Sequence, residues 1–318
     1  MSSVLAARVP ARRVPVRVTL HPTLHAEWTK LRTLASTWWL LLAAVALTIA
    51  VGATVGAAFQ CHPSACAPAQ TGADPAKISF SGVYLGQVVV ALAAVLAVGG
   101  EYGTGMIRLT LTAVPRRLTV LAAKAAVVAG WALAVGVLAV LGSALVGRLI
   151  LPGRGLSAVN GYVVPSLTNG PDMRAAFGSV LYLVLIALLA LGVTMAVRDS
   201  GVAIGVVLGL LYLFPIVATV IPDHVLARHL DQIAPMTVGL YIQATTGLRS
   251  LPLTPWQGLG VLALWACGAL ILGAAVLRFR DALLLLLSAP GRHHRGHADY
   301  RRGYVEVGDG FIQRRLVD

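Results

Sequence analysis

The main pattern along the chain is a series of long apolar runs separated by short polar segments. A helix needs about 20 mostly apolar residues to cross the hydrocarbon core of a bilayer. Six runs meet that length, so the sequence predicts an all-α membrane protein with six transmembrane helices. The predicted spans are Trp38–Phe59, Phe80–Gly100, Leu118–Gly147, Ala176–Val197, Gly201–Ile221 and Gln257–Leu277.

Some of the apolar runs have irregular features. The run beginning at Leu118 is longer than a crossing requires, which favours a tilt or a projection beyond the bilayer. Pro215 lies inside the fifth run and is expected to kink that helix, because it removes a backbone donor. A shorter run, Ala282–Ala289, is predicted to lie at the membrane interface. The first run follows a long leader and is interpreted as a retained anchor rather than a cleaved signal.

The distribution of charge predicts the orientation. Only 12% of the 318 residues are charged, and the formal net charge is +13. Most lysines and arginines lie in the N-terminal segment, between the second and third runs, and after the last run. The positive-inside rule places these segments in the cytoplasm, so both termini are predicted there, at the plasma membrane. This rule explains the charge without a nucleic-acid partner.

Three regions follow from this topology. They are a cytoplasmic N-terminal region (1–37), a transmembrane domain (38–278) and a basic cytoplasmic tail (279–318). The tail contains His293, His294 and His297, a spacing that could bind a metal ion. No carboxylate or Cys completes a site with helical spacing, so a basic tail near anionic lipid is the favoured interpretation.

The predicted spans contain very few ionisable residues. Five have no Asp, Glu, Lys, Arg or His, and the third has only Lys124, which is expected to extend its ammonium toward the headgroups. Proton-coupled transport and intramembrane catalysis need ionisable groups at depth. The sequence also has no phosphate-binding loop of the Walker type. We therefore predict that the chain is not an enzyme and binds neither a metal nor a cofactor itself.

Three cysteines occur in the chain. Cys61 and Cys66 lie in the first predicted external loop, where an oxidising compartment favours a local disulfide. Two free thiols remain an alternative, as does a metal site with His62, although that site would lack a fourth ligand. Cys267 lies within the last run and is interpreted as a small core residue.

Glycines recur at intervals of four residues in the fifth run. Gly201, Gly205 and Gly209 would form a flat stripe on a helix, which allows close approach of another helix. The stripe fits a subunit interface or ordinary packing within the subunit. Gly52 and Gly56 in the first run form a weaker copy of it.

Two predicted cytoplasmic segments have helical patterns of their own. In the segment before the first span, Leu24, Trp28 and Leu31 fall on one face, and Glu27 and Lys30 are expected elsewhere. An amphipathic helix of this kind is predicted to lie in the headgroup plane.

The second segment follows the second span. Thr104 is a suitable N-cap, and Ile107, Leu111 and Val114 form a short apolar stripe that ends at Pro115. A short helix held between two spans could transmit a push, although the same pattern fits an ordinary connector.

Together these segments resemble the permease subunits of ABC-2 type ATP-binding-cassette transporters, especially those of actinobacteria. The first motif is Glu27–Arg32 followed by Ser36–Trp39, and the second is Glu101–Gly105 leading to Ala113–Arg117, with Lys124 at a similar spacing. Each motif is moderately specific, and their joint placement around the second span makes the resemblance strong.

The resemblance implies a connecting helix and a coupling helix that dock into a separate ATPase subunit. The connecting-helix residues are Glu27, Trp28, Lys30, Leu31 and Arg32. The residues that couple to the ATPase are Glu101, Tyr102, Gly103, Thr104, Gly105, Ile107, Arg108 and Leu111.

The resemblance also implies two ATPase copies and a second permease chain, identical or homologous, in an exporter for an amphiphilic or hydrophobic substrate. ATP and Mg would bind the partner. The fifth span and the segment Pro222–Trp256 are expected to line and close the pathway. A charged group in that segment could form an external gate or a solvated surface; its members are Asp223, His224, Arg228, His229 and Asp231. A non-transporting scaffold or sensor subunit is the alternative function.

Overall fold

The computed structural model describes residues 20–33, 35–60, 68, 72–106, 117–162, 166 and 168–287, and all its regular elements in these ranges are helical. The long helices are α1 (Leu20–Thr33), α2 (Ala35–Ala58), α5 (Val83–Gly103), α7 (Arg117–Ile150), α8 (Gly170–Val197), α9 (Ser200–Val220) and α12 (Pro255–Leu287). The shorter ones are α4 (Pro75–Ser79), α10 (His224–Ile233), α11 (Pro235–Leu240) and the 3₁₀ turns η1 (Leu151–Arg154), η2 (Ala158–Asn160), η3 (Tyr241–Gln243) and η4 (Leu248–Ser250).

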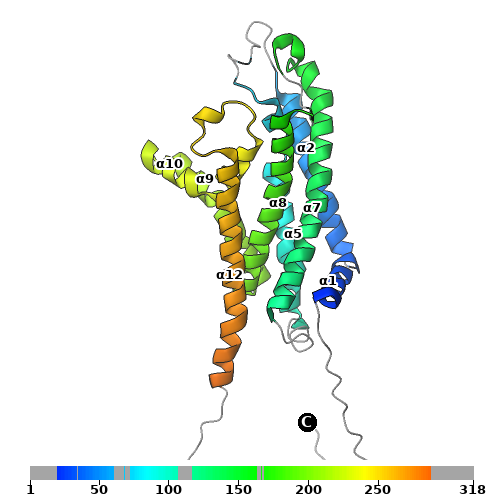
Figure 1. Cartoon of the computed structure of the whole chain (residues 1–318), viewed down its shortest axis with the longest axis vertical. Helices are drawn as coiled ribbons and strands as arrows, with labels where there is room; N and C mark the ends of the chain where they lie inside the picture. The colour runs from blue at the N-terminus through cyan, green and yellow to red at the C-terminus, as the bar shows by residue number, and fades with distance from the viewer. Residues whose placement is uncertain are drawn as a thin grey trace, which may run out of the picture.

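Six of these helices are long and apolar enough to cross a membrane, which confirms the predicted number of spans. They are α2, α5, α7, α8, α9 and α12, and they form an elongated bundle (Figure 1). The helix α1 and the last turns of α12 lie at the same end of that bundle, at the bottom of Figure 1. The connections containing α4, η1 and α10 lie toward the opposite end.

The centre of the bundle is α8. Within its apolar 18-residue stretch, 61% of the residues are buried, whereas only 17% are buried in the corresponding stretch of α9. Figure 1 shows α8 between α7 on one side and α12 on the other. Gly192 lets α8 and α12 approach closely, because a Cβ at this position would lie 2.5 Å from the carbonyl carbon of Ala269. Inside a membrane the hydrophobic effect does not drive helices together. Small residues at such crossings allow the close van der Waals packing that does.

A buried carboxylate fastens the connections at the upper end of Figure 1. Asp74 caps α4 by accepting hydrogen bonds from the backbone N–H groups of Ala76 and Lys77. It also accepts from the Thr245 hydroxyl at 2.7 Å and from the N–H of Thr246 at 3.0 Å. One side chain therefore joins the segment before α5 to the segment before α12. The residues Cys61 and Cys66 lie outside the described ranges.

The apolar run Ala282–Ala289 was predicted to lie at the membrane interface, and its position relative to the membrane stays a prediction. The helix α12 is continuous from Pro255 to Leu287, so residues 282–287 continue the helix beyond the candidate span, which ends at Arg278. Charged residues at 278, 280 and 281 end the apolar stretch without ending the helix, because neither Gly nor Pro interrupts the backbone there. The expected kink at Pro215 stays a prediction; α9 runs through that residue as one helix.

The structure corrects the prediction for Cys267, and for Gly52 and Gly56 it favours packing within the subunit, one of the two interpretations left open. Cys267 is exposed on the surface of α12 rather than buried in the core. Gly52 and Gly56 do not form an open stripe, because Cβ atoms there would lie 2.6 Å from the Ser79 carbonyl oxygen and 3.4 Å from Leu151. This pair serves close packing of α2 within the subunit.

Candidate functional site

The helix α1 is held against the bundle by an aromatic cluster. The ring of Trp28 stacks on that of Trp131 in α7, with 5.1 Å between the centroids. Trp38 in α2 meets the same ring edge-on at 5.0 Å and donates a hydrogen bond from its indole nitrogen to the carbonyl of Arg32. Aromatic pairs in these geometries add stability beyond their buried area. The predicted connecting helix is thus attached to two spans.

The inner face of α1 carries a charged residue. From residue 22 to the end of this helix, the buried side chains are those of Thr23, Glu27 and Leu31, and their spacing of four residues places them on one face. The prediction that put Glu27 away from the apolar face is therefore wrong. Leu24 and Leu31 lie three residues before and four residues after Glu27, so helical geometry places all three side by side.

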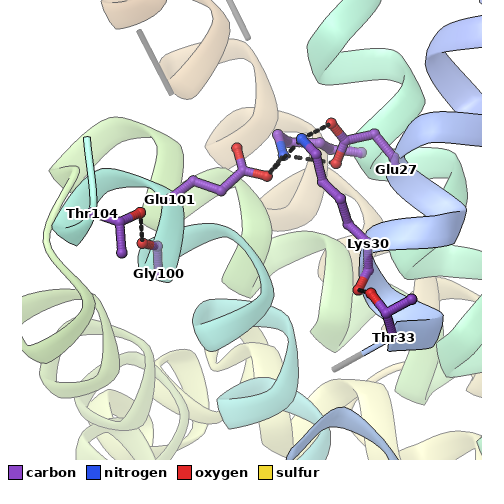
Figure 2. Close-up of polar contacts among 7 residues, drawn as sticks. Glu27, Lys30, Thr33, Gly100, Glu101 and Thr104 are labelled. Carbon is purple, nitrogen blue, oxygen red and sulfur yellow. Dashed lines mark hydrogen bonds and ion pairs between the residues drawn. The ribbon is translucent and has the colours of Figure 1, made fainter. Parts of the chain in front are cut away.

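Glu27 belongs to a buried ion cluster that joins three helices (Figure 2). The ammonium of Lys124 in α7 lies 2.8 Å from Glu27 and 2.7 Å from Glu101 in α5. The ammonium of Lys30 in α1 lies 3.0 Å from Glu27 and 3.2 Å from Glu101. Two carboxylates and two ammonium groups thus alternate at the contact of α1, α5 and α7.

The four groups differ in their exposure to solvent. Only 2% of the Lys124 side chain and 6% of the Glu101 side chain are exposed, against 36% for Lys30. Buried charges need partners, because an isolated charge loses its hydration without compensation. The prediction that Lys124 reaches the headgroups is therefore wrong: its charge is compensated inside the protein by two carboxylates.

Lys30 supplies the second positive charge that balances Glu27 and Glu101, and it lies at the more exposed side of the cluster. Burial lowers the pKa of its ammonium, but the hydrogen bonds and negative charges of Glu27 and Glu101 outweigh that effect, and the net pKa lies above the ordinary value. Lys30 is therefore cationic at neutral pH. Among the described residues, the second carboxylate oxygen of Glu101, Oε2, has no hydrogen-bond partner and is buried.

The helix α5 ends at Gly103, two residues after Glu101. The Thr104 hydroxyl donates to the carbonyl of Gly100 at 2.8 Å, and the Thr104 N–H donates to the same carbonyl (Figure 2). Gly105 follows with a φ of 71°, a left-handed conformation that glycine adopts without strain. Thr104 therefore caps the end of α5, where the sequence predicted the start of the next helix. Ile107, Arg108 and Leu111 lie outside the described residues, and their role stays a prediction.

A protein-family model matches the chain. The model described as ABC-2 family transporter protein matches residues 23–217, which is more than half of the chain. This protein belongs to the ABC-2 transporter family. The matched region includes α1, α5 and α7 and thus the whole ion cluster. No curated protein matches the chain. The chain is a multi-pass membrane permease of the ABC-2 type.

The ABC-2 permease also has a buried polar network that the sequence analysis missed. The amide of Gln87 in α5 donates to the carbonyl of Tyr84 and to the hydroxyl of Tyr212 in α9. The hydroxyl of Tyr182 in α8 donates to the other atom of the amide, Oε1, so Gln87 is fully paired. This network links three spans. Its members carry no charge at neutral pH, so the scarcity of charged residues in the spans did not indicate them; Gln and Tyr inside long apolar runs are the signal that does.

The glycine stripe of the permease lies on an open face of α9. Cβ atoms added to Gly205 or Gly209 would meet nothing within 4 Å. The opposite face, with Ala203, Val207 and Leu211, is buried against the bundle. Packing within the subunit, one of the two interpretations, therefore does not explain Gly205 and Gly209. Contact with another subunit stays a prediction.

Proposed function

We propose that this permease is the transmembrane subunit of an ABC exporter, driven by a separate ATPase subunit. The observation that supports this most directly is the ion cluster of Glu27, Lys30, Glu101 and Lys124. It ties α1 and the end of α5, the two elements expected to dock on the ATPase, to α7. A displacement of either element by the partner would therefore act on a membrane span.

The connection is suited to transmitting force because its members are not free to rotate separately. Lys124 has both carboxylates within 2.8 Å, and separating it from either would leave a buried charge less well compensated. Small displacements of α1 or α5 would then move α7 with them. The assembly would contain two ATPase copies, which bind ATP and Mg, and two permease chains.

The open face of α9 supports the pairing of two permease chains. Its glycines present backbone without side chains, as small residues do where membrane helices associate. In this arrangement α9 and the segment Pro222–Trp256 would lie along the pathway near the interface. The charged residues of α10 would then face the outer opening, with both termini in the cytoplasm and the chain in the plasma membrane.

The surface of the spans supports an amphiphilic or hydrophobic substrate. An apolar groove of about 560 Å³ lies between α8, α9 and α12, with Val193, Val206 and Leu264 in its lining. None of the described residues that line this groove is charged, so they offer no ionic partner to a polar solute. The predicted disulfide between Cys61 and Cys66 would belong to the external side of the same assembly.

Association with the ATPase tests the proposal. We expect a neighbouring gene to encode an ABC ATPase and the tagged permease to co-purify with it. Ile107→Asp or Arg108→Ala should reduce the recovered ATPase about tenfold or more, as loss of an anchoring contact does. Arg154→Ala is the matched control, because Arg154 is exposed at the opposite end of the bundle. Unchanged recovery with Ile107→Asp and Arg108→Ala would contradict the coupling assignment.

A further inference from the structure

A cavity of about 430 Å³ lies between α1, α2 and α5, beside the ion cluster. Its volume falls within the range of about 300–1,000 Å³ that ligand sites occupy. Leu40, Ala93, Leu96 and Ala97 form an apolar wall, and Glu27, Lys30, Thr37 and Thr104 are among the polar residues at its other side. The cavity therefore has the two-part lining that an amphiphile requires.

The apolar wall borders a second, separate void on its inner side and reaches the outer surface of α5 on its other side. A smaller void of about 30 Å³ shares Ala93 and Ala97 with the cavity and ends deeper in the bundle near Val135. In the other direction, Leu96 has an exposed fraction of 46%, so the wall also continues onto the outer surface of α5. An acyl chain could follow this wall from the cavity into the surrounding bilayer.

The charge available to a ligand in this cavity is positive. Both oxygens of Glu27 already accept from lysines, and the unpaired oxygen of Glu101 is itself buried. The Lys30 ammonium is the accessible member of the cluster. The Lys30 ammonium has three N–H donors. Two of them are donated to Glu27 and Glu101, so the third remains for a ligand. Its raised pKa keeps the charge in place at neutral pH.

We propose that this cavity binds an anionic phospholipid, with the phosphate on Lys30 and one acyl chain along Leu40 and Leu96. The occupant would lie between α1 and α5 and would contact the ion cluster directly. This inference goes beyond the proposed function and does not rest on it, because the binding needs this chain and a bilayer alone. A cationic amphiphile fits less well, since each accessible carboxylate oxygen already has a lysine partner.

Lipid retention measured by native mass spectrometry tests the site. The full chain, purified in detergent, is mixed with phosphatidylglycerol or phosphatidylcholine of equal chain length. We expect one phosphatidylglycerol to bind at least about tenfold more tightly than phosphatidylcholine, as a charge-assisted hydrogen bond provides. Lys30→Met removes this preference, whereas Arg32→Met retains it, because Arg32 is an exposed cation of α1 outside the cavity lining.

A second pair of variants tests the apolar wall independently of charge. Ala97→Leu fills the cavity and is expected to lower retention of both lipids, while Ala134→Leu, at an exposed position of α7, leaves retention unchanged. Soluble glycerol phosphate should not displace the lipid, because it has no chain for the wall. Equal retention of the two lipids, equal effects of Lys30→Met and Arg32→Met, or displacement by glycerol phosphate would each overturn the proposal.

Discussion

The energetic roles of the charged residues in the ion cluster differ because their exposure differs. Lys124 is enclosed by protein, and its removal would leave Glu27 and Glu101 with only Lys30 to compensate them. Lys30 is partly solvated, and water can replace part of what it contributes. The same chemical change at these two lysines should therefore have unequal consequences for folding.

We predict that Lys124→Met destabilises the permease by about 3–5 kcal/mol, the usual cost of leaving one member of a buried ion pair uncompensated. Lys30→Met should lower the free energy of unfolding by only about 0–1 kcal/mol, because the Lys30 side chain is partly exposed to solvent. The measurement is thermal and denaturant-induced unfolding in detergent. Lys77→Met, at an exposed position of α4, is the control and should be neutral.

The test is whether Lys124→Met loses more stability than Lys30→Met. Equal losses for Lys30→Met and Lys124→Met would mean that burial does not set the energetics of the cluster. A neutral Lys124→Met would mean that the two carboxylates are not held against Lys124 in the folded permease.

At the scale of helices, glycines have two different uses in this protein. Gly192 lies at the crossing of α8 and α12, where a carbonyl carbon occupies the space of a side chain. Gly205 lies on the open face of α9, where nothing occupies that space. One glycine is thus required for packing within the subunit, and the other is available for contact between subunits.

We predict that Gly192→Val lowers the stability of the isolated permease by about 1–3 kcal/mol or more, as overpacking does. Gly205→Val should leave that stability nearly unchanged and instead reduce pairing of two permease chains. Unfolding in detergent and cross-linking in liposomes measure the two effects. The assignment of the α9 face fails if Gly205→Val destabilises the single chain or leaves cross-linking intact.

Some elements could be predicted from the sequence because their signal is local. The spans follow from apolar runs, whose length alone indicates a crossing. The extension of α12 was missed because hydropathy marks where a span ends, whereas the backbone helix ends only where Gly, Pro or a cap interrupts it. The end of α5 was missed because Thr can serve either helix terminus, and the fold selects the carbonyl of Gly100.

The ion cluster was missed for a different reason. Its members are separated in the sequence by up to 97 positions, and their contact depends on how α1 packs against α5 and α7. A signal was present nonetheless. Lys124 was the only ionisable residue in a predicted span, and Glu27 and Glu101 lay in the two segments expected at the same side of the membrane. Charge compensation alone would have suggested the pairing.

At the scale of the whole molecule, the arrangement separates the place where force would enter from the place where cargo would move. The ion cluster lies at the end of the bundle that contains α1, and the apolar groove lies between α8, α9 and α12. Through α7 and α8, which pack together at the centre, displacement at the first site can reach the second. A protein that only recruits partners would not need this connection.

The most direct test of the central claim is ATP-dependent transport in liposomes that contain the permease and its ATPase. A panel of fluorescent phospholipids and lipophilic dyes supplies amphiphilic probes. We predict ATP-dependent movement of at least one probe, and its loss with Arg108→Ala but not with Arg154→Ala. A stable complex that hydrolyses ATP, moves no probe and is indifferent to Arg108→Ala would contradict the account and favour a non-transporting scaffold.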